Sequence, residues 1–171
     1  MILEARISAL EASRTRGFAA LMEMYENNYI YMRRLVPDLD RSQNMCTSRV
    51  DGAVDLQMEV LDRQAYTTSL RLTHNFTRGE EPEVIPNLML RVYHDARVAE
   101  VLPESWLRGF RYWSFRDPPP VSTLAWRWEV NRFLNRWLRY CLGEGHAFAV
   151  DWAARPALRP KARRWAARLT R

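Results

Sequence analysis

Residues 88–101, LMLRVYHDARVAEV, contain the clearest indication of the fold in this chain. This stretch predicts two β-strands joined by a two-residue turn at Asp95-Ala96. This turn pairs the two strands as follows: Val92 with Ala99, Leu90 with Val101, Arg91 with Glu100, Tyr93 with Val98, and Met89 with Leu102. Apolar side chains then face apolar ones and a basic side chain faces an acidic one, as in stable antiparallel pairs. The stretch therefore predicts an antiparallel sheet.

A second hairpin is expected earlier in the chain. Residues Val54–Val60 alternate apolar and polar side chains, which indicates a strand buried on one face. Asp51-Gly52 precedes this strand and favours a two-residue turn, because such turns need positive φ angles. That turn predicts the following placements: Met45 opposite Met58, Thr47 opposite Leu56, and Cys46 on the outer, polar face.

The third strand, expected over Ala65–Phe76, has one apolar side that consists of Tyr66, Leu70 and Leu72. Matching that side to Val54–Val60 requires an odd connection of about three residues near residues 62–64, because a slip of one residue inverts every side chain. Residues Thr77–Pro86 include the string Arg78-Gly79-Glu80-Glu81-Pro82, which predicts a loop.

Helical periodicity flanks the sheet on both sides. Ile2–Ala12 predicts a short amphipathic helix, and a second helix is expected from Gly17 to Val36, where Pro37 ends it. The apolar row of the second helix is Phe18, Leu21, Met22, Tyr25, Tyr29, Met32 and Leu35.

A last helix follows the proline-rich break at residues 118–120. Ser122 or Thr123 can cap it, and Gly143 and Gly145 are expected to end it. Its buried stripe is Val130, Leu134, Trp137, Leu138 and Cys141.

The order of these elements predicts an α+β domain. It has two N-terminal helices, an antiparallel meander of five to six strands, one long C-terminal helix and then a basic tail; Trp106–Arg116 is the candidate sixth strand. We expect residues 1–145 to form a single domain and residues 146–171 to form a basic C-terminal extension.

Composition narrows the class of protein. Apolar residues make up 47% of the chain and charged residues 27%, which is typical of a globular protein. No apolar run approaches the ~20 residues of a membrane span, and the charged N-terminus lacks a secretory pattern, so we expect a cytoplasmic protein. Cys46 and Cys141 have neither disulfide nor metal-ligand spacing. We expect no metal and no cofactor.

The net charge of +6 is concentrated at one end of the chain. Residues 146–171 contain seven basic residues and one acid, so 7 − 1 = +6, whereas residues 1–145 sum to zero. Charge placed in this way bears on partners rather than on fold. Pro160–Leu169 predicts a basic amphipathic helix, whose candidate contacts to an anionic partner are Lys161, Arg163, Arg164 and Arg168.

Two strings, Tyr93-His94-Asp95-Ala96 and Trp137-Leu138-Arg139-Tyr140-Cys141-Leu142, resemble the YqiB-like family of bacterial proteins, a domain of unknown function. The helix end Arg33-Arg34-Leu35-Val36-Pro37 is similar too. The resemblance implies a small cytoplasmic bacterial protein without an assigned reaction. It covers roughly residues 18–145. Trp126-Arg127-Trp128 departs from the family pattern, and residues 148–171 lie outside it.

His94-Asp95 suggests a general base, because an imidazole lies beside a carboxylate. Adjacent strand residues point to opposite faces, however, so these two side chains form no direct dyad unless the turn brings them together. The alternative is that His94 completes the core row of its strand. His94 is therefore a candidate catalytic residue and also a candidate core residue.

The other sheet face offers a second candidate site. Arg91, Tyr93 and Glu100 can line a shallow polar pocket with Arg139 or Tyr140, or Arg91 and Glu100 can form an ordinary cross-strand pair. Separately, Trp106–Arg116 and Trp126-Arg127-Trp128 interleave aromatic residues with arginine. That pattern is typical either of a single-stranded nucleic-acid surface or of a tryptophan-rich core layer covered by arginine stems.

Two classes of function remain open. The first is a non-enzymatic binding or adaptor protein, whose basic tail contacts an anionic partner such as RNA or an acidic protein. The second is a small-molecule enzyme or sensor for a nucleotide-like ligand, with His94 as acid/base and Arg91 and Arg139 as anion contacts. An exposed helix or sheet edge could also form a homo-oligomer. No glycine-rich phosphate loop, serine elbow or paired metal-ligand motif is present in the sequence.

Overall fold

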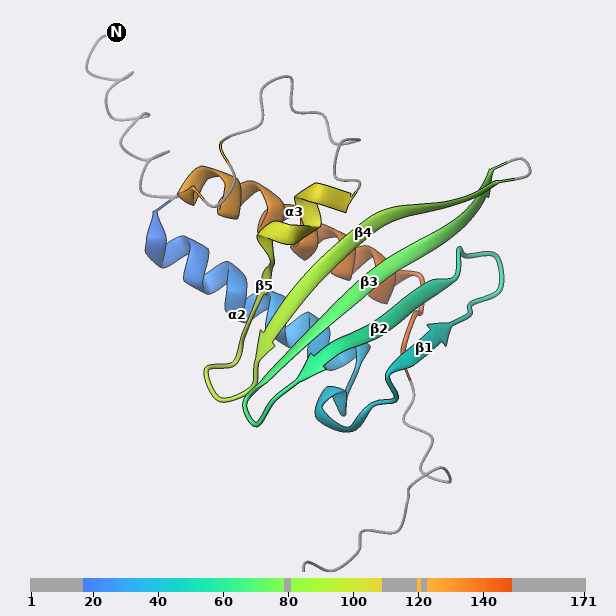
Figure 1. The fold of residues 1–171 in the computed structure, drawn as a ribbon, viewed down its shortest axis with the longest axis horizontal. Helices are drawn as coiled ribbons and strands as arrows, with labels where there is room; N and C mark the ends of the chain where they lie inside the picture. Colours follow the sequence, from blue (N-terminus) through green and yellow to red (C-terminus); the bar gives the residue numbers. More distant parts are fainter. Residues whose placement is uncertain (1–16, 79–80, 109–119, 121–122, 149–171) are drawn as a thin grey trace, which may run out of the picture.

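Two helices cover one face of a five-stranded antiparallel sheet (Figure 1). The computed structural model describes residues 17–78, 81–108, 120 and 123–148. In chain order the elements are α2 (Phe18–Leu35), η1 (Leu39–Arg41), β1 (Met45–Ser48), β2 (Leu56–Arg63), β3 (Thr67–Arg78), β4 (Glu81–Tyr93), β5 (Val98–Val101), η2 (Pro103–Arg108) and α3 (Leu124–Gly143). The sheet order is β1-β2-β3-β4-β5, so the α+β meander is confirmed. The helix predicted at Ile2–Ala12 lies outside the described residues.

The β4–β5 hairpin has the predicted register. The four paired positions are Leu90 with Val101, Arg91 with Glu100, Val92 with Ala99, and Tyr93 with Val98. The backbone nitrogen of Leu102 also donates to the Met89 oxygen at 2.8 Å. Arg97 closes the turn with a φ of 55°. Apolar pairing across the strands was therefore sufficient to fix this register.

The loop predicted over Thr77–Pro86 is wrong, because β3 and β4 continue through most of it. Pro86 lies at a bulge: Thr73 pairs with Asn87 and Asn75 with Val84, so Ile85 and Pro86 together face His74. A bulge interrupts the ladder of hydrogen bonds, and proline is tolerated there because it has no N–H to donate.

The β1–β2 register differs from the prediction by one residue. Met45 pairs with Glu59, and Cys46 rather than Met45 pairs with Met58. Cys46 consequently packs against the core, whereas Met45 is 65% exposed. Gly52 does adopt a positive φ of 81°, but β2 begins at Leu56 instead of Val54, so the connection is longer than a two-residue turn.

The apolar faces of β2 and β3 coincide as predicted, but a different local structure brings them together. Met58 pairs with Leu72 and Val60 with Leu70, so the apolar faces coincide. A bulge between Val60 and Asp62 supplies the odd residue in place of a three-residue connection. Tyr66 lies in the turn and is 66% exposed, so its predicted place on the apolar side is wrong.

The helix ends follow local sequence signals. Helix α2 ends at Leu35 before Pro37, but Phe18 at its start is 69% exposed and does not join the apolar row. Thr123 caps α3, and its side chain accepts a hydrogen bond from the Trp126 nitrogen at 3.2 Å. The candidate sixth strand Trp106–Arg116 is not a strand at its described start, because residues 106–108 belong to η2. The rest of that segment lies outside the described residues.

The C-terminus of α3 turns back toward the sheet. Gly145 has a φ of 89°, and the nitrogens of Gly145 and His146 bond to the oxygens of Leu142 and Cys141 at 3.1 and 3.0 Å. This Schellman arrangement leads the chain to Phe148, which is buried and whose nitrogen donates to the Leu35 oxygen at 2.8 Å. The first residues of the predicted basic extension thus pack against the body.

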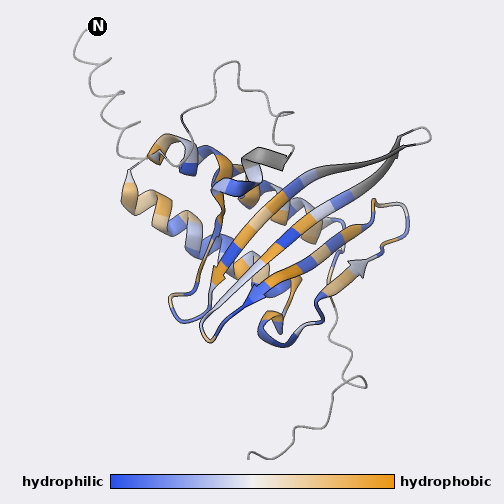
Figure 2. Ribbon diagram, viewed as in Figure 1, coloured by the Kyte–Doolittle hydropathy of each residue, from blue (hydrophilic) through white to orange (hydrophobic). Residues whose placement is uncertain are grey.

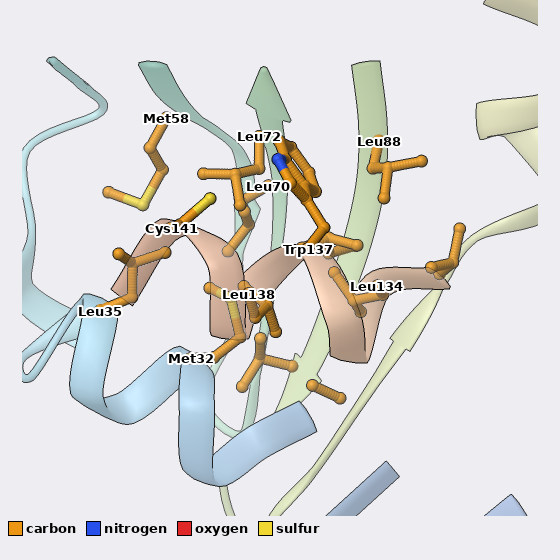
Figure 3. Packing of buried hydrophobic residues seen from close by; sticks show 14 of the residues in the cluster. Met32, Leu35, Met58, Leu70, Leu72, Leu88, Leu134, Trp137, Leu138 and Cys141 are labelled. Carbon is orange, nitrogen blue, oxygen red and sulfur yellow. The ribbon is translucent and has the colours of Figure 1, made fainter. Parts of the chain in front are cut away.

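The main core lies between the sheet and the two helices (Figure 3). Buried and partly exposed residues alternate at the start of β2 and over residues 87–93 of β4. Figure 2 colours the strands by hydropathy, and hydrophobic and hydrophilic residues are interspersed along them. The core residues labelled in Figure 3 are Met32, Leu35, Met58, Leu70, Leu72, Leu88, Leu134, Trp137, Leu138 and Cys141. Within the described residues, no helix is long and apolar enough to cross a membrane.

Candidate functional site

His94 directly follows β4 in the turn, where it is partly buried and forms a side-chain hydrogen bond. Its Nε2 lies 2.8 Å from the Oγ1 of Thr68, which is fully buried. Asp95 is exposed in the turn, where its carboxylate accepts a hydrogen bond from the Ala96 nitrogen. Burial lowers the pKa of His94, while the charge of Asp40 opposes that shift. The His94 ring therefore forms a hydrogen bond that stabilises the fold, and its lowered pKa makes it a weaker base.

Glu100 is the centre of a polar cluster at the β5 edge. Its carboxylate accepts hydrogen bonds from the Tyr93 hydroxyl at 2.9 Å and from Arg127 of α3 at 2.8 Å. Arg91 pairs with Glu100 in backbone register, but its side chain instead donates to the Ser69 hydroxyl at 3.2 Å. The expected Arg91–Glu100 ion pair is thus replaced by an Arg127–Glu100 pair.

Tyr25 of α2 completes this cluster. Burial raises the pKa of its hydroxyl, and the nearby Arg127 opposes this shift. Among the described residues this buried hydroxyl has no hydrogen-bond partner of good geometry. No sequence pattern indicated that α2 and α3 would meet β5 here. The contact is a consequence of tertiary packing, in which Leu21, Tyr25 and Val98 form a small second core.

The four predicted ligand-binding residues do not converge. Arg91, Tyr93 and Glu100 lie near one another at the β4–β5 edge, and Arg91 projects from the sheet face opposite to that of Leu90. Arg139 is exposed on α3, which covers the face to which Leu90 belongs.

The Trp126-Arg127-Trp128 string belongs mainly to the interior. Trp126 is fully buried in the main core, and Trp128 packs against the second core. Arg127 is neutralised by Glu100. This geometry fits a tryptophan-rich core layer better than a nucleic-acid surface.

His74 of β3 lies in a buried polar cluster that the sequence did not predict. Its Nδ1 accepts a hydrogen bond from the indole N–H of Trp137 at 3.3 Å, and its Nε2 lies 3.8 Å from the Cys141 sulfur. The His146 ring is also close, with 5.7 Å between ring centroids. Because Nδ1 is an acceptor, the proton of the neutral ring is on Nε2, directed at the sulfur.

The pKa shifts in this cluster oppose nucleophilic chemistry. Burial, together with the nearby His146, lowers the pKa of His74 to about 4, and burial raises the pKa of the Cys141 thiol to about 12. A catalytic cysteine–histidine pair needs a lowered thiol pKa and a proton-accepting imidazole. His74 and Cys141 therefore remain neutral at physiological pH and act as core residues.

His146 ties the end of α3 to strand β1. Its Nδ1 lies 3.1 Å from the Ser48 hydroxyl, which also accepts a hydrogen bond from the Ala147 nitrogen at 3.2 Å. Two of the three histidines, His74 and His146, thus meet across the core. The described part of the chain contains no group of three or more metal-ligating side chains.

A pocket of about 280 Å³ opens beside His74. It is lined by His74, Pro86, Phe133, Arg136, Trp137 and Tyr140. The spacing Phe133, Trp137, Tyr140 places three aromatic rings along one side of α3, which is a signal that the sequence did contain. Pro86 could not be placed in this pocket from the sequence, because residues 77–86 were predicted to form a loop.

The fold and these clusters define an α+β protein with a five-stranded antiparallel sheet, and comparison with known families gives its family. Residues 31–147 match the family described as "Protein of unknown function (DUF1249)", so the chain belongs to that family. It is 29% identical to the uncharacterised protein YqiB of Escherichia coli K12, over 77% of this chain and 92% of the relative. The YqiB proteins of E. coli O6:H1 and O157:H7 give the same values. No solved structure matches.

Proposed function

We propose that this chain is a non-catalytic, cytoplasmic binding or adaptor protein that contacts an anionic partner through its basic C-terminal segment, residues 146–171. The observation that carries the proposal is the charge distribution, because that segment holds the entire net charge of +6. Clustered arginine and lysine neutralise phosphates and release counterions, which favours binding to nucleic acid. RNA is the first partner to test, and an acidic protein is the second.

The chemistry of the body supports a binding role over a catalytic one. His74 and Cys141 have pKa values shifted away from reactivity, and the pKa of His94 is lowered by burial. Glu100 is held by Tyr93 and Arg127. The alternative enzyme or sensor with His94, Arg91 and Arg139 has less support, because Arg91 and Arg139 occupy different sides of the sheet–helix sandwich.

The test compares the full chain with a variant in which four basic residues are replaced: Lys161→Gln, Arg163→Gln, Arg164→Gln and Arg168→Gln. Neutralisation is preferable to truncation at Gly145, because His146 and Phe148 are buried and hold the end of α3 in place. A matched truncation ends after Phe148.

A gel-shift assay with total RNA gives the readout. The proposal expects a shift with the full chain and a much weaker one with both altered chains. Equal binding by all three chains would contradict a role for this segment. If RNA fails to bind, capture of an acidic protein that resists RNase and is lost in the four-residue variant identifies the second partner class.

A further inference from the structure

The pocket beside His74 is formed by two elements that meet at a bulge. Helix α3 contributes Phe133, Arg136, Trp137 and Tyr140, which follow one another at helical spacing and therefore project to one side. Strands β3 and β4 contribute His74 and Pro86 at the position where the ladder shifts. We call these six residues the His74 pocket.

Four aromatic rings line the His74 pocket: Tyr140 is half-exposed, whereas Phe133, Trp137 and His74 are buried and expose only small parts of their rings. Phe133 and Trp137 are nearly parallel, at 12° with 6.1 Å between ring centroids. The His74 ring meets Trp137 and Tyr140 edge to face, at centroid distances of 5.4 and 6.2 Å. The indole N–H of Trp137 donates its hydrogen bond to His74, so it is not available to a ligand in the pocket. Aromatic rings prefer such walls, which offer stacked and edge-to-face contacts.

Arg136 is the charged residue of the His74 pocket. It is exposed, and among the described residues it forms no ion pair with a carboxylate. Tyr140, one turn further along α3, is half-exposed and places a hydroxyl-bearing ring beside it. A guanidinium beside aromatic faces suits a ligand that is both flat and negatively charged, because arginine binds carboxylate and phosphate with two parallel hydrogen bonds.

We propose that the His74 pocket binds a small planar aromatic compound that carries one anionic group. The ring lies against Tyr140 and covers the small exposed parts of Phe133 and Trp137, and the anion contacts Arg136. A volume of about 280 Å³ is just below the roughly 300–1,000 Å³ of ordinary ligand pockets, which restricts the site to a compound of one or two rings. None of the six lining residues belongs to the basic C-terminal segment, so this proposal does not rest on the proposed function.

The test uses 2-naphthoate as the probe and follows the Trp137 indole N–H by proton–nitrogen correlation NMR on the full chain. The Trp137→Phe spectrum assigns that signal. We expect a saturable shift with 2-naphthoate, and weaker binding of the uncharged 2-naphthylmethanol and of the non-aromatic cyclohexanecarboxylate. Arg136→Gln should weaken naphthoate binding about tenfold, to the level of the alcohol, because one charge-assisted contact is lost.

Arg132→Gln is the matched control, since Arg132 is exposed on the same helix but does not line the pocket. It should leave naphthoate binding within twofold, roughly, of the unaltered chain. The proposal is overturned if millimolar 2-naphthoate gives no saturable shift of the Trp137 signal. It is equally overturned if Arg132→Gln weakens binding as much as Arg136→Gln, or if cyclohexanecarboxylate binds as tightly as 2-naphthoate.

Discussion

Protonation of His74 should destabilise the protein in mild acid, because this imidazole is buried and held neutral. It is 3% exposed, and its pKa is lowered from 6.5 to about 4 by burial and by the neighbouring His146. In the unfolded chain the ring regains its ordinary pKa. Between the two values the unfolded chain binds more protons, so the free energy of unfolding falls as the pH falls from 6.5 toward 4. Above pH 6.5 the His74 ring is neutral in both the folded and the unfolded chain, and its contribution to the free energy of unfolding is fully present.

The magnitude follows from the difference between the two pKa values. A shift from 6.5 to about 4, at about 1.36 kcal/mol per pKa unit, corresponds to roughly 3 kcal/mol of unfolding free energy. Urea unfolding of the full chain and of His74→Gln across this pH range measures it. Glutamine can still accept the Trp137 N–H but does not titrate, so the unaltered chain should lose roughly 3 kcal/mol more than the variant.

Equal losses of unfolding free energy in the full chain and in His74→Gln would show that His74 does not cause the loss of stability in acid. If His74→Gln does not fold, an NMR titration of the unaltered chain decides the matter. The His74 ring signals should remain those of a neutral imidazole until the pH nears 4. A midpoint close to 6.5 would show that the ring is solvated and not part of the core.

Three further predictions concern the framework around this core. Gly145→Ala should cost about 1–2 kcal/mol in urea unfolding because its φ is 89°, whereas Gly143→Ala, in helix with open space around its Cα, should be neutral or slightly stabilising; equal effects would contradict the role of the αL position. Asn131→Ala should cost about 1–3 kcal/mol, measured in the same way, because the Val101 N–H loses its acceptor at 3.0 Å; a change near zero would mean that water replaces the amide. Cys141, buried and with a pKa of about 12, should resist a thiol reagent until the protein unfolds, while Cys46, whose pKa is also raised by burial but which is only partly buried, should react more slowly than a free thiol but before unfolding; rapid labelling of both would be inconsistent with this packing.

The sequence was most informative where neighbouring strands constrain one another. In the β4–β5 hairpin every facing pair had a chemical match, so one register was clearly best. Between β1 and β2 the Asp51-Gly52 signal located a turn correctly but said nothing about the residues between Gly52 and Leu56. One unforeseen residue was enough to exchange the places of Met45 and Cys46.

The candidate sites depended on contacts that local patterns do not encode. His74 and Cys141 are 67 positions apart and meet only because α3 packs on the sheet. Pro86 was interpreted as a loop residue, since proline breaks regular strands, and the bulge that accommodates it is a property of the paired strands. Arg127 was noticed for its place between two tryptophans, but its partner Glu100 became visible only in the folded chain.

The salt dependence of RNA binding tests most directly whether the basic C-terminal segment is the functional part of this chain. For a single strand, the logarithm of the binding constant falls with the logarithm of the salt concentration, with a slope of about −0.7 for each neutralised phosphate. Removing four phosphate contacts should therefore make this slope shallower by up to about 2.8. The full chain and the variant with Lys161, Arg163, Arg164 and Arg168 replaced by glutamine are compared by fluorescence anisotropy across a range of salt concentrations. The slope should be steep for the full chain and much shallower for the variant. Identical slopes, or RNA binding that does not respond to salt, would contradict this expectation.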